Sequence, residues 1–299
     1  MKILVAGGSG FVGKNLCREL RRRGHSVTAL SRSPGDDDLP DGVAKAMGNV
    51  TAYDSIAEHF AGMDAVVNLV ALSPLFKPSG GYQRHFEVHL RGTENCVRAA
   101  EEHDVDRFVQ MSGHPVGPDV QTSYHRAKAE GEEVVRDSSL DWTIFRPSVI
   151  FGDDAEFLRF TKLLAPPYLT PLPGGGKTPF QPIWIGDLAS MMADAVDCED
   201  DRHVGETYTL GGPEVLTLAE VARLAHGADG RSVTVIPIPM ALTGIGLSIV
   251  GYVPGVPFGE EQYRSLKLDS TTPDNDVSAF GVEESDLRSL SAYLSETEA

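Results

Sequence analysis

The chain opens with a short apolar run, a glycine-rich turn and an amphipathic stretch. Lys2–Ala6 has the pattern of a buried strand, and Lys14–Arg23 has apolar positions at helical spacing. The alternation continues through the first half of the chain. Further strands are expected at Ser26–Leu30, Ala65–Leu69, Arg107–Met111 and Trp142–Phe145, and further helices at Gly92–His103 and Tyr124–Ser138. This order predicts an α/β fold, a doubly wound parallel sheet with helices on both faces.

The pattern changes after about Gly152. Proline becomes frequent, and Gly174–Gly176 marks a loop. Helices are expected at Gly186–Val196, Thr217–Ala225 and Glu284–Leu294, and a strand with a turn at Tyr208–Pro213. Because no clean linker interrupts the chain, we expect a Rossmann-type core in residues 1–152 whose sheet is completed by later segments. Residues 153–299 would then form a smaller C-terminal region on the substrate side, intertwined with that core.

The charge balance excludes one class of partner. The net charge is −17, with 43 acidic and 26 basic residues, so no basic stripe is present to neutralise the phosphates of a nucleic acid. Acidic excess with little lysine is typical of proteins from salt-loving organisms, where salt screens the repulsion between surface carboxylates. An ordinary acidic cytosolic protein is the alternative interpretation.

The cysteines and one uncharged segment bear on the compartment. Cys17, Cys96 and Cys198 are isolated, which predicts core thiols in a reducing compartment and no metal site. A first strand at Lys2 leaves no room for a signal peptide, so we expect a cytoplasmic protein. Ser232–Phe258 carries no charge, and its proline-free part is too short to span a bilayer. This segment either lines a pocket or, through Met240–Phe258, contacts a protein complex or the inner face of the membrane.

The glycine turn predicts a dinucleotide site. Gly7, Gly10 and Gly13 follow a strand and precede a helix. In such a turn the first glycine allows the tight bend, the second lets the backbone approach the pyrophosphate, and the third lets helix and strand pack closely. The pyrophosphate then lies at the positive end of the helix.

The end of the second strand bears on the choice of cofactor. An NAD enzyme usually carries Asp or Glu there to bind the ribose hydroxyls, whereas this chain has Ser31, Arg32 and Ser33. Arg32 with either serine could bind a 2′-phosphate, which favours NADP(H) over NAD(H). Asp36–Asp38 lie beyond the strand end and are interpreted as solvated surface.

Three residues form a candidate catalytic set. Tyr124 and Lys128 are spaced to lie on one helix face, where the lysine ammonium would lower the pKa of the phenol and hold the nicotinamide ribose. Ser112 follows a strand at the expected carboxyl edge of the sheet and could hold a substrate oxygen beside Tyr124. This set predicts proton transfer coupled to hydride transfer.

Together the glycine turn, the Ser/Tyr/Lys set and Arg146–Gly152 resemble the extended short-chain dehydrogenase/reductase superfamily, also called the NAD-dependent epimerase/dehydratase superfamily. The runs Tyr124–Gly152 and Leu210–Thr217 are similar to the atypical branch related to the NADPH-binding 39-kDa accessory subunit of respiratory complex I. His89 departs from the pattern, because it stands where relatives usually have asparagine, and His114 is interpreted either as an extra acid/base or as a loop residue.

The resemblance implies roles for further residues. Ser112, Tyr124 and Lys128 match the catalytic set. The residues that match cofactor contacts are Gly7, Ser9, Gly10, Phe11, Val12 and Gly13 at the pyrophosphate, Asn49 and Val50 at the adenine, Asn68, Val70 and Ala71 beneath the ribose and nicotinamide, and Pro147, Ser148 and Val149 at the nicotinamide end.

Three hypotheses of function follow. The first is an NADP(H)-dependent oxidoreductase that acts on a small carbonyl or hydroxyl compound with Tyr124 as the acid/base, the apolar loops favouring an apolar substrate. The second is an NADPH-binding accessory or assembly module of an electron-transfer or quinone-related system with little turnover. The third is a nucleotide-sugar epimerase or dehydratase, which would be expected to hold NAD tightly.

Overall fold

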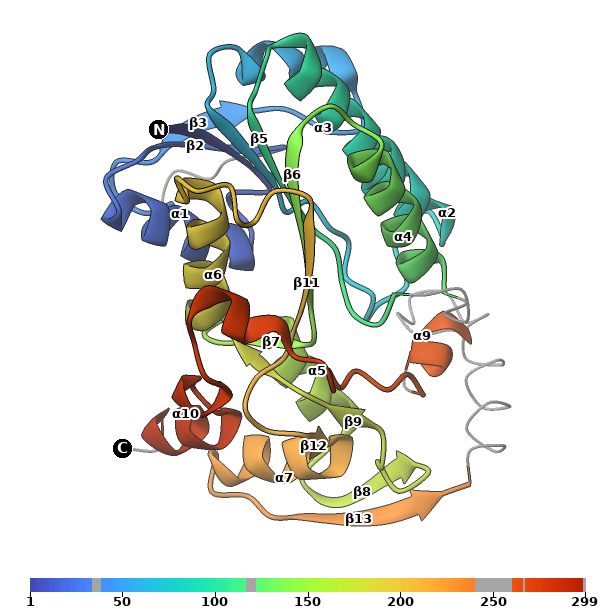
Figure 1. The fold of residues 1–299 in the computed structure, drawn as a ribbon. Helices are drawn as coiled ribbons and strands as arrows, with labels where there is room; N and C mark the ends of the chain where they lie inside the picture. The colour runs from blue at the N-terminus through green and yellow to red at the C-terminus, as the bar shows by residue number, and fades with distance from the viewer. Residues whose placement is uncertain (34–38, 117–121, 240–259, 266, 298–299) are drawn as a thin grey trace.

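A seven-stranded parallel sheet forms the centre of the protein (Figure 1). The computed structural model describes residues 1–33, 39–116, 122–239, 260–265 and 267–297. The strands run in the order β11-β6-β5-β4-β1-β2-β3, and every neighbouring pair is parallel. Their bounds are Lys2–Ala6 (β1), Ser26–Ser31 (β2), Ala44–Met47 (β3), Ala65–Asn68 (β4), Arg107–Met111 (β5), Asp141–Pro147 (β6) and Glu206–Leu210 (β11). The α/β doubly wound fold expected from the sequence is confirmed.

Helices cover both faces of this sheet. Figure 1 shows α1 (Phe11–Arg22) and α6 (Ile185–Asp197) on one face and α3 (Arg91–Glu102) and α4 (Ser123–Arg136) on the other. In β1, Ile3 and Val5 pack toward α1 and α6, whereas Leu4 and Ala6 pack toward the opposite layer. A strand buried on both faces needs apolar residues at every position, which is why β1 has a continuous apolar run.

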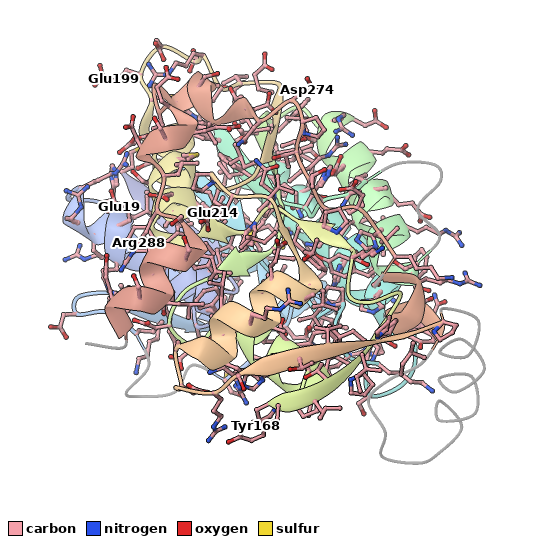
Figure 2. All side chains as sticks on the ribbon, turned by 90° about the horizontal axis from the view of Figure 1, so that it is seen from below. Glu19, Tyr168, Glu199, Glu214, Asp274 and Arg288 are labelled. Atoms are coloured by element: carbon pink, nitrogen blue, oxygen red, sulfur yellow. The ribbon has the colours of Figure 1, made fainter. Side chains whose placement is uncertain are left out.

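The smaller lobe is built from the second half of the chain. Three pairs of short strands lie in it: β7 (Ile150–Phe151) with β10 (Ile183–Trp184), β9 (Pro179–Phe180) with β12 (Leu216–Thr217), and β8 (Tyr168–Pro173) with β13 (Val233–Ile238). Its helices are α5 (Glu156–Leu164), α7 (Leu218–Gly227), α9 (Glu260–Ser265) and α10 (Leu290–Thr297). In Figure 2, Tyr168 marks the outer margin of this lobe, where 63% of the residue is exposed.

Short helical elements connect the larger ones. They are η1 (Tyr53–Ser55), η2 (Ala57–Phe60), α2 (Gln83–His85), the π-helical η3 (Phe86–Leu90), η4 (Asp276–Phe280) and η5 (Glu284–Asp286). The single terminal helix expected at Glu284–Leu294 is wrong. The chain forms η5 first and begins α10 only at Leu290, because Leu287 between them is extended.

No helix among the described residues is long and apolar enough to cross a membrane. Met240–Phe258 and Asp36–Asp38 lie outside the described residues. The sequence-based interpretations of these two segments therefore stay predictions.

Candidate functional site

The turn between β1 and α1 has the geometry expected for a dinucleotide cradle. Gly7 has a φ of +83°, and a β-carbon there would stand 3.2 Å from the backbone of Leu69 and Val70. At Gly13 a β-carbon would stand 2.3 Å from the carbonyl oxygen of Gly7. The first glycine therefore permits the bend, and the last lets α1 approach the end of β1 closely.

Helix α1 presents its N-terminus to this turn. Gly10 precedes the helix and offers no side chain to cap it, and the first turn contains no acidic residue. The first N–H groups of a helix lack partners within the helix and lie at the positive end of its dipole. This end of α1 can therefore bind an anion such as a pyrophosphate.

A cavity of about 530 Å³ begins at the glycine turn and extends over the ends of β1, β2 and β4. Among the residues predicted to bind the cofactor, those that line it are Gly7, Ser9, Gly10, Ser31, Arg32, Ser33, Asn49, Val50, Val70 and Ala71. Ser31 Oγ is buried here and has no hydrogen-bond partner among the described residues. We call this space the cofactor-side cavity, because it holds the glycine cradle, a cation and an unpaired hydroxyl.

A second cavity of about 430 Å³ continues from the first and shares the lining residues Gly7, Gly10, Leu69, Ala71 and Leu72. The predicted residues that line it are Phe11, Val12, Gly13, Ser112, Tyr124, Pro147, Ser148 and Val149. Ser112 Oγ is buried and has no partner in hydrogen-bonding geometry within the described part of the chain, although it lies close enough to Glu132 to help lower the pKa of that carboxyl. This substrate-side cavity joins the glycine turn to the predicted catalytic tyrosine.

Tyr124 is held at the first turn of α4. Glu261 of α9 accepts a hydrogen bond from the backbone N–H of Ser123 at 3.1 Å, which fastens this end of the helix. The rings of His85, His89 and His125 pack edge-on against Tyr124, with centroids 5.7, 5.1 and 4.9 Å away. Burial raises the pKa of Tyr124 to about 12. The expectation that Lys128 lowers this pKa is wrong for the structure described, because burial dominates and leaves a neutral phenol.

Lys128 lies one helical turn after Tyr124 and is buried. Its Nζ donates a hydrogen bond to the carbonyl oxygen of Met111 at 2.8 Å. Burial lowers the pKa of the ammonium to about 8, against an opposing effect of Glu132. Lys128 is not among the residues that line the two cavities. It instead supports Met111, which lines the substrate-side cavity.

A network of charged residues surrounds the buried Glu132, one helical turn after Lys128 on α4. Glu132 accepts hydrogen bonds from Arg146 Nε at 2.9 Å and from Arg136 Nη2 at 2.8 Å, and only 1% of its side chain is exposed. Burial alone would raise the pKa of this carboxyl, but Arg146, the Ser112 hydroxyl and Arg136 together hold it below its ordinary value. Glu132 therefore stays ionised beneath the helix that carries Tyr124 and Lys128.

The histidines around Tyr124 are held neutral. Burial is the largest cause that lowers the pKa of His85 and of His125 to about 4, and it places the pKa of His89 far below the usual range. His89 Nε2 accepts a hydrogen bond from the Leu72 N–H at 2.9 Å. The imidazole of His89 therefore fixes the loop that lies between the two cavities.

Two other predicted or debated residues serve the loops of the site. Asn68 is buried, donates to Gln110 Oε1 at 2.9 Å, accepts from the Val70 N–H at 3.3 Å, and lines neither cavity. His114 lines the substrate-side cavity, and its Nε2 donates to the Thr271 carbonyl oxygen at 2.8 Å. Asn68 thus positions the segment that precedes the cofactor-lining residues, and His114 ties the site to the C-terminal part of the chain.

Several lining residues were not predicted from the sequence. Arg84 enters the cofactor-side cavity from α2 and forms an ion pair with Glu87, yet nothing in the sequence marks it as a cavity residue. Gly113, Glu156 and Phe157 line the substrate-side cavity. Gly113 directly follows Ser112, which was the available signal for it, whereas Glu156 and Phe157 begin α5 and carried no such signal.

The comparisons with known proteins show an NAD(P)H-binding domain in this part of the chain. Residues 7–164 match the model of the NAD(P)H-binding family. The chain is 30% identical to the Arabidopsis thaliana protein named NADH dehydrogenase (ubiquinone) 1 alpha subcomplex subunit 9, over 74% of this chain and 56% of that protein. It is 29% identical to 2-alkyl-3-oxoalkanoate reductase of Stenotrophomonas maltophilia, over 77% and 76% of the two chains. It therefore spans little more than half of the first relative and about three quarters of the second.

Solved structures show the same fold at lower identity. The Thermus thermophilus UDP-glucose 4-epimerase in complex with NAD is 20% identical, with a TM-score of 0.67 over 94% of this chain and 99% of the epimerase. The epimerase Mth375 of Methanothermobacter thermautotrophicus is 19% identical, with a TM-score of 0.75 over 99% and 90%. The family model extends from the glycine turn to the end of α5, across both cavities. This chain belongs to the NAD(P)H-binding family.

Proposed function

We propose that the protein is an NADP(H)-dependent reductase that reduces a carbonyl compound with Tyr124 as the proton donor. The observation that carries the proposal is the position of Tyr124, a partly buried and neutral phenol that lines a cavity continuous with the glycine turn. A protonated tyrosine suits the reductive direction, because reduction of a carbonyl ends with protonation of its oxygen.

The residues of the cofactor-side cavity fit a dinucleotide with a 2′-phosphate. The glycine turn and the N-terminus of α1 would hold the pyrophosphate. The unpaired Ser31 hydroxyl and the Arg32 guanidinium line the region that follows β2, where no carboxylate of the described residues lines the cavity. A bound NADPH would supply the hydride, and the protein supplies binding, orientation and the proton.

Proton delivery follows from the two shifted groups. An alkoxide is a far stronger base than a phenolate, so Tyr124 can give up its proton to the substrate oxygen. Return of a proton from Lys128, whose pKa is about 8, to a phenolate whose conjugate acid has a pKa of about 12 is favourable. The Ser112 hydroxyl can donate a hydrogen bond to the same substrate oxygen.

The test is a calorimetric titration of the protein with NADPH and NADH in high salt, followed by a carbonyl substrate screen. We expect NADPH to bind more tightly than NADH. Arg32→Ala should weaken the binding of NADPH by about 10- to 100-fold, since a charge-assisted hydrogen bond contributes about 1.5–3 kcal/mol, and should change the binding of NADH little. Tyr124→Phe should retain cofactor binding and lose turnover. Full activity of Tyr124→Phe, or tighter NADH binding, would contradict the proposal.

A second candidate is an NADPH-binding accessory module with little turnover. It is favoured by the relatives from Arabidopsis thaliana and Neurospora crassa, which are named as subunits of NADH dehydrogenase or NADH-ubiquinone oxidoreductase. Under this proposal NADPH binds, no carbonyl is reduced, and the protein cosediments with a membrane fraction. The same titration and screen distinguish the two candidates.

A further inference from the structure

An apolar slot opens from the substrate-side cavity. It has a volume of about 40 Å³, and its lining includes Phe157, Phe160, Phe180 and Leu218. It shares Pro74, Leu75, Val149 and Phe157 with the cavity that Tyr124 lines. A ligand whose oxygen meets Tyr124 therefore has an apolar recess available to another part of the same molecule.

The walls of this slot are fixed by aromatic packing. Phe157 and Phe160 lie one turn apart on α5, and Phe180 comes from β9. Phe157 packs against Phe180 with centroids 5.5 Å apart, and Phe160 packs edge-on against Phe76 at the same separation. Because each ring is held by a neighbour, the slot is preformed by the fold.

Two polar side chains line the slot, Gln262 and Ser265, and the amide of Gln262 already has partners. Gln262 Oε1 accepts a hydrogen bond from the Tyr82 hydroxyl at 3.1 Å, and Gln262 Nε2 donates to the Pro74 carbonyl oxygen at 3.4 Å. A polar ligand group placed in the slot would lose its hydrogen bonds to water and find few replacements, which costs free energy. An alkyl group has no such loss.

Charge disfavours anionic substrates on this side of the site, away from the N-terminus of α1. Among the described residues, no lysine or arginine lines the substrate-side cavity or the slot, and Glu156 contributes a carboxylate. The residues outside the described ranges contain no lysine or arginine either, so they add no cationic side chain. A phosphate, nucleoside diphosphate or carboxylate would be buried there without a cation, next to a negative charge.

We infer that the substrate is an uncharged carbonyl compound with an aliphatic tail, whose oxygen meets Tyr124 and whose tail enters the Phe157/Phe160/Phe180 slot. This inference rests on the proposed reductase function. It argues against a nucleotide sugar as the substrate, because a buried diphosphate needs cations and no lysine or arginine is among the described residues that line this side of the site.

The experiment measures binding of methyl ketones of increasing chain length to the NADPH-loaded protein by calorimetry. The dissociation constant should fall about three- to fourfold for each added methylene, because this ratio corresponds to the free energy gained when one methylene is buried. The fall should stop once the slot is full. Levulinate, which carries the same ketone with a carboxylate, and UDP-glucose should bind more weakly than the ketone of matching size.

Two variants locate the effect. Phe160→Ala lengthens the slot and should move the plateau to longer ketones, while Leu169→Ala removes an apolar side chain that is 63% exposed on β8 and should leave the series unchanged. The inference would be overturned by a dissociation constant that does not change with chain length, or by tighter binding of levulinate or UDP-glucose than of the matching ketone. It would also be overturned if the plateau did not move to longer ketones in Phe160→Ala. Ketones that bind with this dependence but are never reduced would refute the reductase and leave the slot assignment standing. Reduction of hydrophilic carbonyl compounds, with no dependence of binding on chain length, would refute the slot assignment and leave the reductase standing.

Discussion

A β-carbon on Gly113 would stand 2.9 Å from the hydroxyl oxygen of Tyr124. Real β-carbons essentially never approach an atom this closely, so the phenol occupies its position only because residue 113 has no side chain. Gly113 follows Ser112, and both line the substrate-side cavity with Tyr124. The glycine therefore sets how far the Tyr124 hydroxyl can reach toward the end of β5.

Gly113→Ala tests this relationship. The methyl group would displace the Tyr124 hydroxyl, and we expect turnover to fall by about 10- to 100-fold, since small misplacements of a reacting group are costly. The affinity for NADPH should stay unchanged, because Gly113 does not line the cofactor-side cavity. Gly227→Ala is the matched control: a β-carbon at this exposed position on α7 meets nothing within 4 Å, so activity should persist and stability should rise slightly. Wild-type turnover in Gly113→Ala would refute the contact.

The sequence predicted the central layers well, because burial on both faces leaves a visible apolar run in β1, β2, β4 and β5. It missed β3, since Ala44–Met47 has only one buried residue and carries an exposed lysine. Such an edge strand has no apolar pattern to detect. It also merged η5 and α10, because an apolar spacing cannot show the extended residue that separates them.

The sequence predicted the parts of the site that lie within one short motif. It missed the parts that are formed by segments far apart in the chain. The glycine turn and the Tyr124/Lys128 spacing are local, and the structure brings Tyr124 to a cavity continuous with that turn. The raised pKa of Tyr124 could not be read from the spacing, because it depends on burial by histidines from η3 and α2. The apolar slot is assembled from α5, β9 and α7, which are far apart in sequence.

Arg84 is a second cation in the cofactor-side cavity. We expect Arg84→Ala to weaken the binding of NADPH by about three- to tenfold, because the partly exposed pair with Glu87 already balances part of the charge of Arg84. Arg98→Ala is the control, since Arg98 pairs with Glu102 in the same way and stacks over Tyr53, outside both cavities. Equal effects of the two substitutions in a calorimetric titration would show that only net charge matters.

Glu132 connects the stability of the fold to the charge of Lys128. Glu132→Gln leaves two arginines without their buried carboxylate, so the free energy of unfolding should fall by about 3–5 kcal/mol in urea denaturation. The same change removes the interaction that raises the pKa of Lys128, so the alkaline limb of the pH–rate profile should move to lower pH. Glu133→Gln, on the exposed side of α4, should change neither quantity. If Glu132→Gln lowers the free energy of unfolding but leaves the alkaline limb of the pH–rate profile in place, Glu132 has a structural role only.

The neutral histidines make the fold sensitive to acid. His85 and His125 have a pKa of about 4 in the folded protein against an ordinary value of 6.5, because burial disfavours the imidazolium. Between these pH values the unfolded chain binds protons that the folded chain does not. Stability should therefore fall as the pH is lowered from about 6.5 to about 4, by roughly 2–3 kcal/mol for each histidine.

His85→Gln separates this effect from the titration of the carboxylates, whose protonation relieves the repulsion of a chain with a net charge of −17. Both proteins share that contribution, so the difference between their unfolding free energies at pH 7 and pH 4 isolates the histidine. We expect the loss on acidification to be roughly 2–3 kcal/mol smaller in His85→Gln than in the wild type. His103→Gln, at the end of α3 and outside the cluster, controls for the removal of an imidazole. An equal loss in His85→Gln and the wild type would mean that His85 titrates normally in the folded protein, and the neutral surroundings assigned to Tyr124 and Lys128 would have to be revised.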